Sequence, residues 1–295
     1  MAFDTLIAAI RRLNTSVEAV AAIGAELRLR GEGHDGEPLV RDLLRRVMHE
    51  IDPQLLDGVD VNQAATALGI IQAFFRQAVD LLENPARPRG WFYDDPVVLQ
   101  AQGQGSRVAI RAIEAAAAER PPLREVLQSP GAFLDVGTGV GWLAIEAARS
   151  WPALTVVGID PWEPSLALAR TNLAASGAAG RIEFRAQAIE DLEDRDAFTL
   201  AYLPLPFLPG TLIDAVLQRV HRALARDGFL VALVYAPQPS ALDAALTALR
   251  TVRGGGHPWE TSEIEERMRR LDFAEVESFK PPGALVHLVL GRRAA

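Results

Sequence analysis

The chain contains no cysteine. Disulfides, thiolate metal sites and cysteine nucleophiles are therefore excluded together, and a reducing compartment is favoured. No stretch approaches the roughly 20 apolar residues of a membrane span. The start, MAFDTLIAAIRRLN, carries an early acid and too short an apolar run for a signal peptide. We expect a cytoplasmic protein without a membrane segment.

Basic residues are also scarce: 30 Lys and Arg stand against 38 Asp and Glu, for a net charge of −8, and Lys280 is the single lysine. Nucleic-acid binding rests on clustered Lys and Arg that neutralise phosphates, so no nucleic-acid partner is expected. The five histidines do not pair with acids at a spacing such as H-E-x-x-H, which argues against a metal site.

The first 130 residues have helical patterns throughout. Apolar residues at three- and four-residue spacing predict helices over 4–13 and 16–30, with Asp4 and Ser16 as N-caps. We assign residues 1–120 to an N-terminal helical domain that serves as a cap and as a homodimer surface.

Two later helices of this domain have further signals. Asp95 and Pro96 predict the start of a helix that continues to Arg120. The apolar face of residues 62–83 is wider than one core contact needs, so this helix is a core helix, a dimer seam or a cap over an apolar acceptor.

From Phe133 onward, short apolar runs alternate with helical patterns. This alternation predicts parallel βαβ units and a doubly wound α/β sheet in a second domain, residues 121–295. Only KPPG separates the last two apolar runs, which is too short for a helical crossover, so these two strands form an antiparallel hairpin.

The segment LDVGTGVGW carries the strongest motif of the second domain. Asp135 ends a predicted strand, and three glycines follow before a helix: Gly137, Gly139 and Gly141. Such a loop lets a ligand approach the backbone at a helix N-terminus. Trp142 stands where a dinucleotide fingerprint has its third glycine, so a pyrophosphate fits poorly. Asp160 ends the next strand, where a carboxylate can accept both ribose hydroxyls.

Together these segments resemble class I S-adenosylmethionine-dependent methyltransferases of the small-molecule type with an N-terminal helical domain. LDVGTGVG is similar to their first motif and VVGIDPWEPSLALARTNL to the next, and the resemblance spans about residues 131–292. It implies a Rossmann-like seven-stranded sheet of order 3-2-1-4-5-7-6 with strand 7 antiparallel. It also implies S-adenosylmethionine as cofactor.

The resemblance implies roles for particular residues. Asp135 and the glycines would face the methionine part and the sulfonium, Asp160 the ribose, and Trp162 the adenine. Gln187 stands where the family often has an Asp that meets the adenine amino group, and its amide oxygen can accept there. The full expected cofactor set is Asp135, Gly137, Thr138, Gly139, Gly141, Asp160, Pro161, Trp162, Gln187, Ala188, Ile189, Tyr202 and Leu203.

The residues after strand 4 indicate which class of molecule accepts the methyl group. Family members that methylate amines often have Asn/Asp-Pro-Pro-Tyr/Phe there, whereas this chain has LPLPF at 203–207, so Pro204 and Phe207 would form an apolar acceptor wall. Plant-type O-methyltransferases have a catalytic His where alignment puts Phe207 or Leu208. His257, in a loop resembling their Gly-Gly-Lys-Glu, is the one candidate base, since a base is needed only when the acceptor still holds its proton.

Residues 90–106 form the other conspicuous segment. They are either an interdomain linker packed by aromatics or a lid over the site. As a lid, Trp91, Phe92 and Tyr93 would cover the ligands, with Gln100 and Gln104 on one face of the following helix.

We predict a methyltransferase acting on a small, largely apolar molecule, mainly by proximity and alignment, in specialised metabolism. A donor-binding fold with a sensing or non-methyl role is an alternative. A protein or nucleic-acid methyltransferase is disfavoured by the acidity and the missing amine motif.

Overall fold

The computed structural model describes residues 2–32, 37–281 and 285–294, and it divides into two compact units. The first comprises Met1–Pro85 and Asp95–Gln102, and the second comprises Ala86–Asp94 and Gly103–Ala295. The division passes through α4, so residues 103–120 belong to the second unit, whereas the sequence analysis assigned them to the N-terminal domain.

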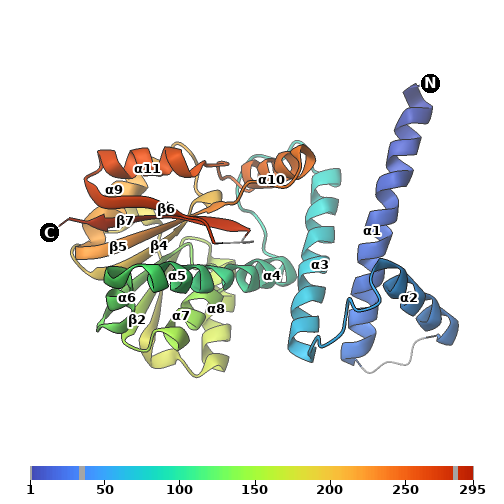
Figure 1. The fold of residues 1–295 in the computed structure, drawn as a ribbon, viewed down its shortest axis with the longest axis horizontal. Helices are drawn as coiled ribbons and strands as arrows, with labels where there is room; N and C mark the ends of the chain where they lie inside the picture. Colours follow the sequence, from blue (N-terminus) through green and yellow to red (C-terminus); the bar gives the residue numbers. More distant parts are fainter. Residues whose placement is uncertain (1, 33–36, 282–284, 295) are drawn as a thin grey trace. The chain divides into compact units, whose positions relative to one another are not determined.

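The first unit is helical (Figure 1). Its elements are α1 (Ala2–Glu32), α2 (Pro38–Ile51), α3 (Val61–Glu83) and most of α4 (Pro96–Ser106). Asp60 caps α3 through a capping box with Gln63, and the Asp95 carboxylate caps α4 by accepting the Val97 N–H at 2.9 Å, as the sequence predicted for Asp95.

The predicted break between two N-terminal helices is wrong, because α1 is continuous. Asn14 and Thr15 lie inside the helix: the Asn14 amide donates to Glu18 at 2.7 Å, and the Thr15 hydroxyl is 3.4 Å from the Arg11 carbonyl. Ser16 is thus no N-cap. No proline or glycine stands between the two predicted segments, so nothing forces the chain out of helical geometry.

The predicted continuous helix from Pro96 is instead interrupted. The helix α4 ends at Ser106, whose hydroxyl donates to the Gly103 carbonyl at 2.7 Å, and α5 (Val108–Glu119) begins after Arg107. Two glycines in the last turn of α4 weaken helical propagation there.

The second unit is built on a seven-stranded sheet whose order, β3-β2-β1-β4-β5-β7-β6, confirms the prediction. The strands are β1 (Gly131–Val136), β2 (Leu154–Asp160), β3 (Ile182–Ala186), β4 (Phe198–Pro204), β5 (Leu224–Tyr235), β6 (Phe273–Phe279) and β7 (Val286–Arg293). The strand β7 runs antiparallel to both β5 and β6, so the hairpin inferred from KPPG is also confirmed.

Helices cover both faces of the sheet (Figure 1). One face packs on α5, α6 (Pro121–Gln128) and α7 (Trp142–Ser150), and α8 (Glu163–Ser176) follows β2. The other face packs on α9 (Ile213–Ala223) and α11 (Thr261–Arg270), while α10 (Ala241–Arg253) follows β5. Because parallel strands share one carboxyl edge, the loops after β1, β2, β3 and β4 meet at that edge, where ligands bind in open α/β sheets.

Candidate functional site

The three glycines of the loop after β1 have two different roles. Gly137, Gly139 and Gly141 all have positive φ angles, of 66°, 56° and 78°. A Cβ on Gly137 or Gly139 would meet no heavy atom closer than 3.8 Å, so room for a ligand lies beside these two. A Cβ on Gly141 would lie 2.5 Å from the Phe184 ring, so this glycine serves packing against β3.

Asp135 brings a buried carboxyl to this loop. It is 1% exposed, and the Thr138 hydroxyl donates to its Oδ2 at 2.7 Å. The pKa of Asp135 is raised to about 7, mainly by burial; the Thr138 hydrogen bond lowers it and the nearby charge of Asp160 raises it, and the value of about 7 includes all three. No described Lys or Arg forms an ion pair with it, so a ligand cation would complete this site.

Asp160, at the end of β2, is held in a fixed orientation. Its Oδ2 accepts the Gly139 N–H at 2.9 Å and its Oδ1 accepts the Trp162 N–H at 2.8 Å. Burial raises the pKa of Asp160, and the two backbone bonds oppose that rise. Each oxygen retains a further acceptor position, so the carboxylate can take two hydroxyl donors at once.

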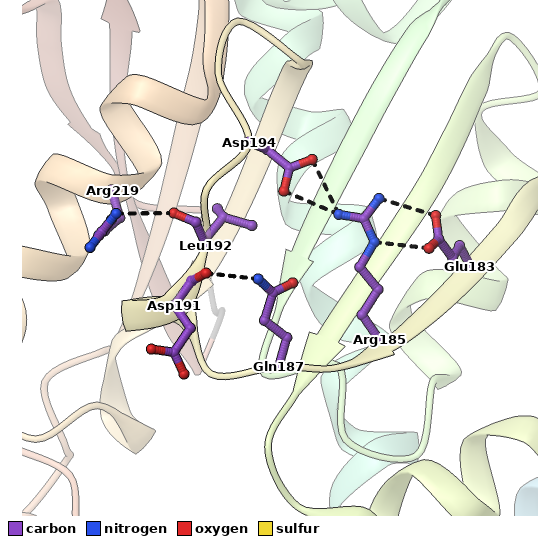
Figure 2. Close-up of polar contacts among 7 residues, drawn as sticks. All are labelled: Glu183, Arg185, Gln187, Asp191, Leu192, Asp194 and Arg219. Carbon is purple, nitrogen blue, oxygen red and sulfur yellow. Dashed lines mark hydrogen bonds and ion pairs between the residues drawn. The ribbon is translucent and has the colours of Figure 1, made fainter.

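The residues expected beside the adenine follow β3. Figure 2 shows the Gln187 side-chain amide donating to the Asp191 carbonyl at 2.9 Å, which leaves the amide oxygen available as an acceptor. Ile189 is 7% exposed and packs in the core with α9, so only its backbone can face a ligand. The neighbouring Arg185 is held by Glu183 and Asp194. The roles of Gln187, Ala188 and Ile189 stay predictions.

The aromatic segment 91–93 contacts both Trp162, which is predicted to bind S-adenosylmethionine, and Phe207, which follows β4. The Trp162 indole N–H donates to the Tyr93 carbonyl at 2.8 Å. The Trp91 ring makes edge contacts with Tyr93 and Phe207, at centroid distances of 5.3 and 5.9 Å. The segment therefore lies where a lid over both ligands is expected, and its closure stays a prediction.

Sequence reasoning missed Arg87, and it named Trp162 only for the adenine and not for this bond to Tyr93. The Arg87 guanidinium lies 5.6 and 5.3 Å from the Phe92 and Tyr93 ring centroids and donates to the Gly90 carbonyl at 3.1 Å. The position of Arg87 between two prolines and shortly before three consecutive aromatic residues was the signal that could have identified it.

We expect Trp162→Phe to loosen the segment without removing the aromatic ring. The Tyr93 carbonyl would lose a hydrogen bond of roughly 0.5–1.5 kcal/mol. Amides of residues 91–94 should then exchange about tenfold faster by hydrogen exchange. The matched control is Trp151→Phe, because the buried Trp151 indole nitrogen has no hydrogen-bond partner. Equal exchange rates in both variants would contradict a role for the Trp162–Tyr93 hydrogen bond in holding this segment.

At the end of β4, two residues that are expected to contact the cofactor have buried side chains. Tyr202 and Leu203 are 3% and 1% exposed and pack in the cores on opposite faces of the sheet, so their side chains point into the protein. Burial raises the pKa of Tyr202, which keeps its hydroxyl neutral. Pro204 lies 3.8 Å from the Cβ position of Gly137, and Phe207 is 40% exposed. Pro204 and Phe207 thus form the accessible apolar wall.

The loop 255–257 packs directly against this wall. A Cβ on Gly256 would lie 1.8 Å from the Pro206 carbonyl oxygen, and one on Gly255 would lie 3.0 Å from the Gly90 Cα. Only glycines allow three backbone segments to come this close. His257 is exposed, and its ring centroid is 4.3 Å from that of Trp259.

The two glutamines are separated by the division of the chain. Gln100 belongs to the first unit and its role stays a prediction. The Gln104 oxygen accepts from Arg107 at 3.1 Å, and Arg107 in turn pairs with Glu146. Gly103 lies so close to the glycine loop that a Cβ would sit 2.2 Å from a Val140 methyl group.

The described residues contain no cluster of three or more His, Asp or Glu side chains suited to a metal ion. In those same ranges, every helix is too short or too polar to cross a membrane.

Comparison with known proteins agrees with the fold. Residues 133–228 match a family model described as a methyltransferase domain. A ubiquinone/menaquinone biosynthesis C-methyltransferase from Citrifermentans bemidjiense is 33% identical over 113 residues, which are 37% of this chain and 47% of that protein. The chain spans half or less of the length of the first curated relatives that it matches.

Two solved structures match the full chain in fold. An O-methyltransferase family protein from Burkholderia thailandensis has a TM-score of 0.72 and 15% identity, covering 100% of this chain and 98% of that chain. Human N-acetylserotonin methyltransferase in complex with S-adenosylmethionine has a TM-score of 0.71 and 14% identity, covering 97% and 98%.

Proposed function

Since the chain contains a class I, S-adenosylmethionine-dependent methyltransferase domain, we propose that it methylates a small, largely apolar molecule. The observation that carries this proposal is the juxtaposition, at one edge of the sheet, of two oriented acids with an apolar wall. Leu203–Leu208 contains no titratable side chain.

The residues at the edge fit this donor. Gly137 and Gly139 leave room beside the loop, Asp135 offers a buried acid to a cation, and Asp160 presents two oriented oxygens. When bound, the donor supplies a methyl group already activated on a positively charged sulfur. The protein's contribution is then to align the acceptor and exclude water, and alignment alone can supply about 7–11 kcal/mol in favourable intramolecular cases.

Trp91 and Phe207 would hold the acceptor by shape. Their rings meet edge to face, and prolines on either side of Leu205 and after Leu208 restrict the backbone of the wall. Incubation of the protein with methyl-labelled donor and host extract tests the proposal. Label should enter a small apolar fraction. Label in protein or nucleic acid alone would contradict it.

We expect His257→Ala to leave turnover of the acceptor so identified within a few-fold. The ring is exposed and lies against Trp259, and no described acid hydrogen-bonds to it, so nothing orients it as a base. Steady-state kinetics measures the effect. A loss of turnover of about 100-fold or more, the size typical of removing a general base, would instead establish His257 as the base.

We propose that the N-terminal helices form a homodimer. On α1, exposed apolar side chains follow a spacing of three and four residues, which is typical of a helix–helix seam: Phe3, Leu6, Ile10, Leu13, Val17 and Val20. A second exposed apolar row lies on α2. We also propose that the protein is cytoplasmic, which the absence of cysteine supports, and that it acts in specialised metabolism.

A further inference from the structure

A pocket of about 610 Å³ lies in the second unit, beyond the wall at the end of β4. Residues 89–90, 209–211, 255–257 and Trp259 line it, together with Glu263 and Arg267 of α11. Its volume falls within the roughly 300–1,000 Å³ of small-ligand sites. Neither Asp135 nor Asp160 contributes to its lining, so it is distinct from the expected donor site.

Two buried side-chain atoms in the lining of this pocket lack a hydrogen-bond partner, and both are donors. Arg89 is exposed and forms no ion pair with a described acid. The Arg267 Nε and the Trp259 indole nitrogen are buried without a hydrogen-bond partner. Such donors favour a ligand that is rich in acceptors.

Two acids, Glu263 and Asp214, lie near the pocket, and each has a contact of its own. Glu263 accepts the Glu260 N–H at 3.1 Å in the cap of α11. Asp214 lies 3.6 Å from the Arg267 Nε, and the Arg267 guanidinium also stacks 4.8 Å from the Trp259 ring centroid. These contacts fix Arg267 and leave Arg89 as the cation that is available to a ligand.

The pocket adjoins the apolar wall in sequence and in space. Gly90 precedes Trp91, Pro209 follows Phe207 by two residues, and the rings of Trp91 and Phe207 touch. A molecule lying on these rings can therefore extend a polar end toward Arg89.

We propose that this pocket binds an anionic group, such as a carboxylate, at one end of an otherwise apolar acceptor, with Arg89 as its principal cation. The inference rests on the proposed function because it assigns the pocket to the acceptor site. A bidentate guanidinium–carboxylate pair gives both orientation and affinity. Anchoring one end there would position the remainder of the acceptor against Trp91 and Phe207.

The test compares 2-naphthoate with its neutral amide, 2-naphthamide, by calorimetry on the full chain. Naphthoate should bind at least tenfold more tightly, and Arg89→Gln should reduce this preference to within about threefold. The matched control is Arg226→Gln, since Arg226 is also exposed and lies outside the pocket, on β5. S-adenosylhomocysteine should bind together with naphthoate and with unchanged affinity in Arg89→Gln.

Equal affinity for the two probes, undetectable naphthoate binding, or an unchanged preference in Arg89→Gln would each overturn the proposal. So would mutually exclusive binding of naphthoate and S-adenosylhomocysteine. Failure of the proposed function has a different signature: S-adenosylhomocysteine itself would not bind, whatever the naphthoate result.

Discussion

Asp160→Ala should reduce the affinity for S-adenosylmethionine by about 100-fold or more, measured by calorimetry. The carboxylate is oriented by the N–H groups of Gly139 and Trp162, so its remaining acceptor positions are fixed for two ribose hydroxyls. Hydrogen bonds to a charged group contribute roughly 1.5–3 kcal/mol each, and every 1.4 kcal/mol corresponds to about tenfold in affinity. Losing both accounts for the expected effect.

The control is Asp191→Ala, which removes an exposed carboxylate that follows β3 at the same edge of the sheet. This variant should keep its affinity for S-adenosylmethionine within about twofold. If both variants were weakened alike, the cause would be a general loss of negative charge. Circular dichroism must show a native fold for Asp160→Ala, since two backbone donors lose their acceptor. An unchanged affinity in this variant would refute the cofactor site.

Much of the sheet could be predicted because its signals are local. Alternating apolar runs and helices specify parallel βαβ units, and the four-residue link KPPG permits only a hairpin, so the sequence reaches the correct direction of β7. The strand order needed the family resemblance in addition, because β1 pairs with β4 across more than 60 residues.

Helix boundaries were predicted less well, for an opposite reason. Ser16 is a good N-cap in isolation, yet α1 continues through it, since propagating a helix is easier than nucleating a second one. The glycine loop shows a related difference. The three glycines look equivalent in sequence, but Gly141 is required by the ring of Phe184, which lies more than 40 residues away.

The expected site residues also differ in what the fold does with them. Asp135 and Asp160 both form hydrogen bonds with residues of the glycine loop, whereas Tyr202 and Leu203 lie at the end of β4 and direct their side chains into the two cores. Strand alternation predicts that adjacent residues such as Tyr202 and Leu203 face opposite sides of the sheet. It does not predict that helices or loops bury both sides at the end of β4. The link from Trp162 to Tyr93 involves a backbone carbonyl, which no residue pattern reveals.

The buried acid at the centre of the site leads to the second large effect, a pH-dependent donor affinity. Burial raises the pKa of Asp135 to about 7. A cationic ligand favours the ionised carboxylate, so affinity for S-adenosylmethionine should fall by about tenfold between pH 7.5 and pH 6, as the carboxylate takes up a proton. In Asp135→Asn the affinity should be low at both pH values and nearly independent of pH.

The same shift has the opposite consequence for stability without donor. Because the folded-state pKa lies above the unfolded value, the native state binds more protons between about pH 4 and pH 7, and stability falls as pH rises through that window. Asp135→Asn removes this loss, so it should melt several degrees above the unmodified chain at pH 8 and close to it at pH 5. The Thr138 hydroxyl can still donate to the Asn oxygen, which preserves the loop. A variant less stable at pH 8, with donor affinity unchanged by pH in the unmodified chain, would show that Asp135 is ionised and already satisfied before the donor binds. The expected pairing of higher stability with weaker donor binding is what a buried acid kept for a cationic ligand requires.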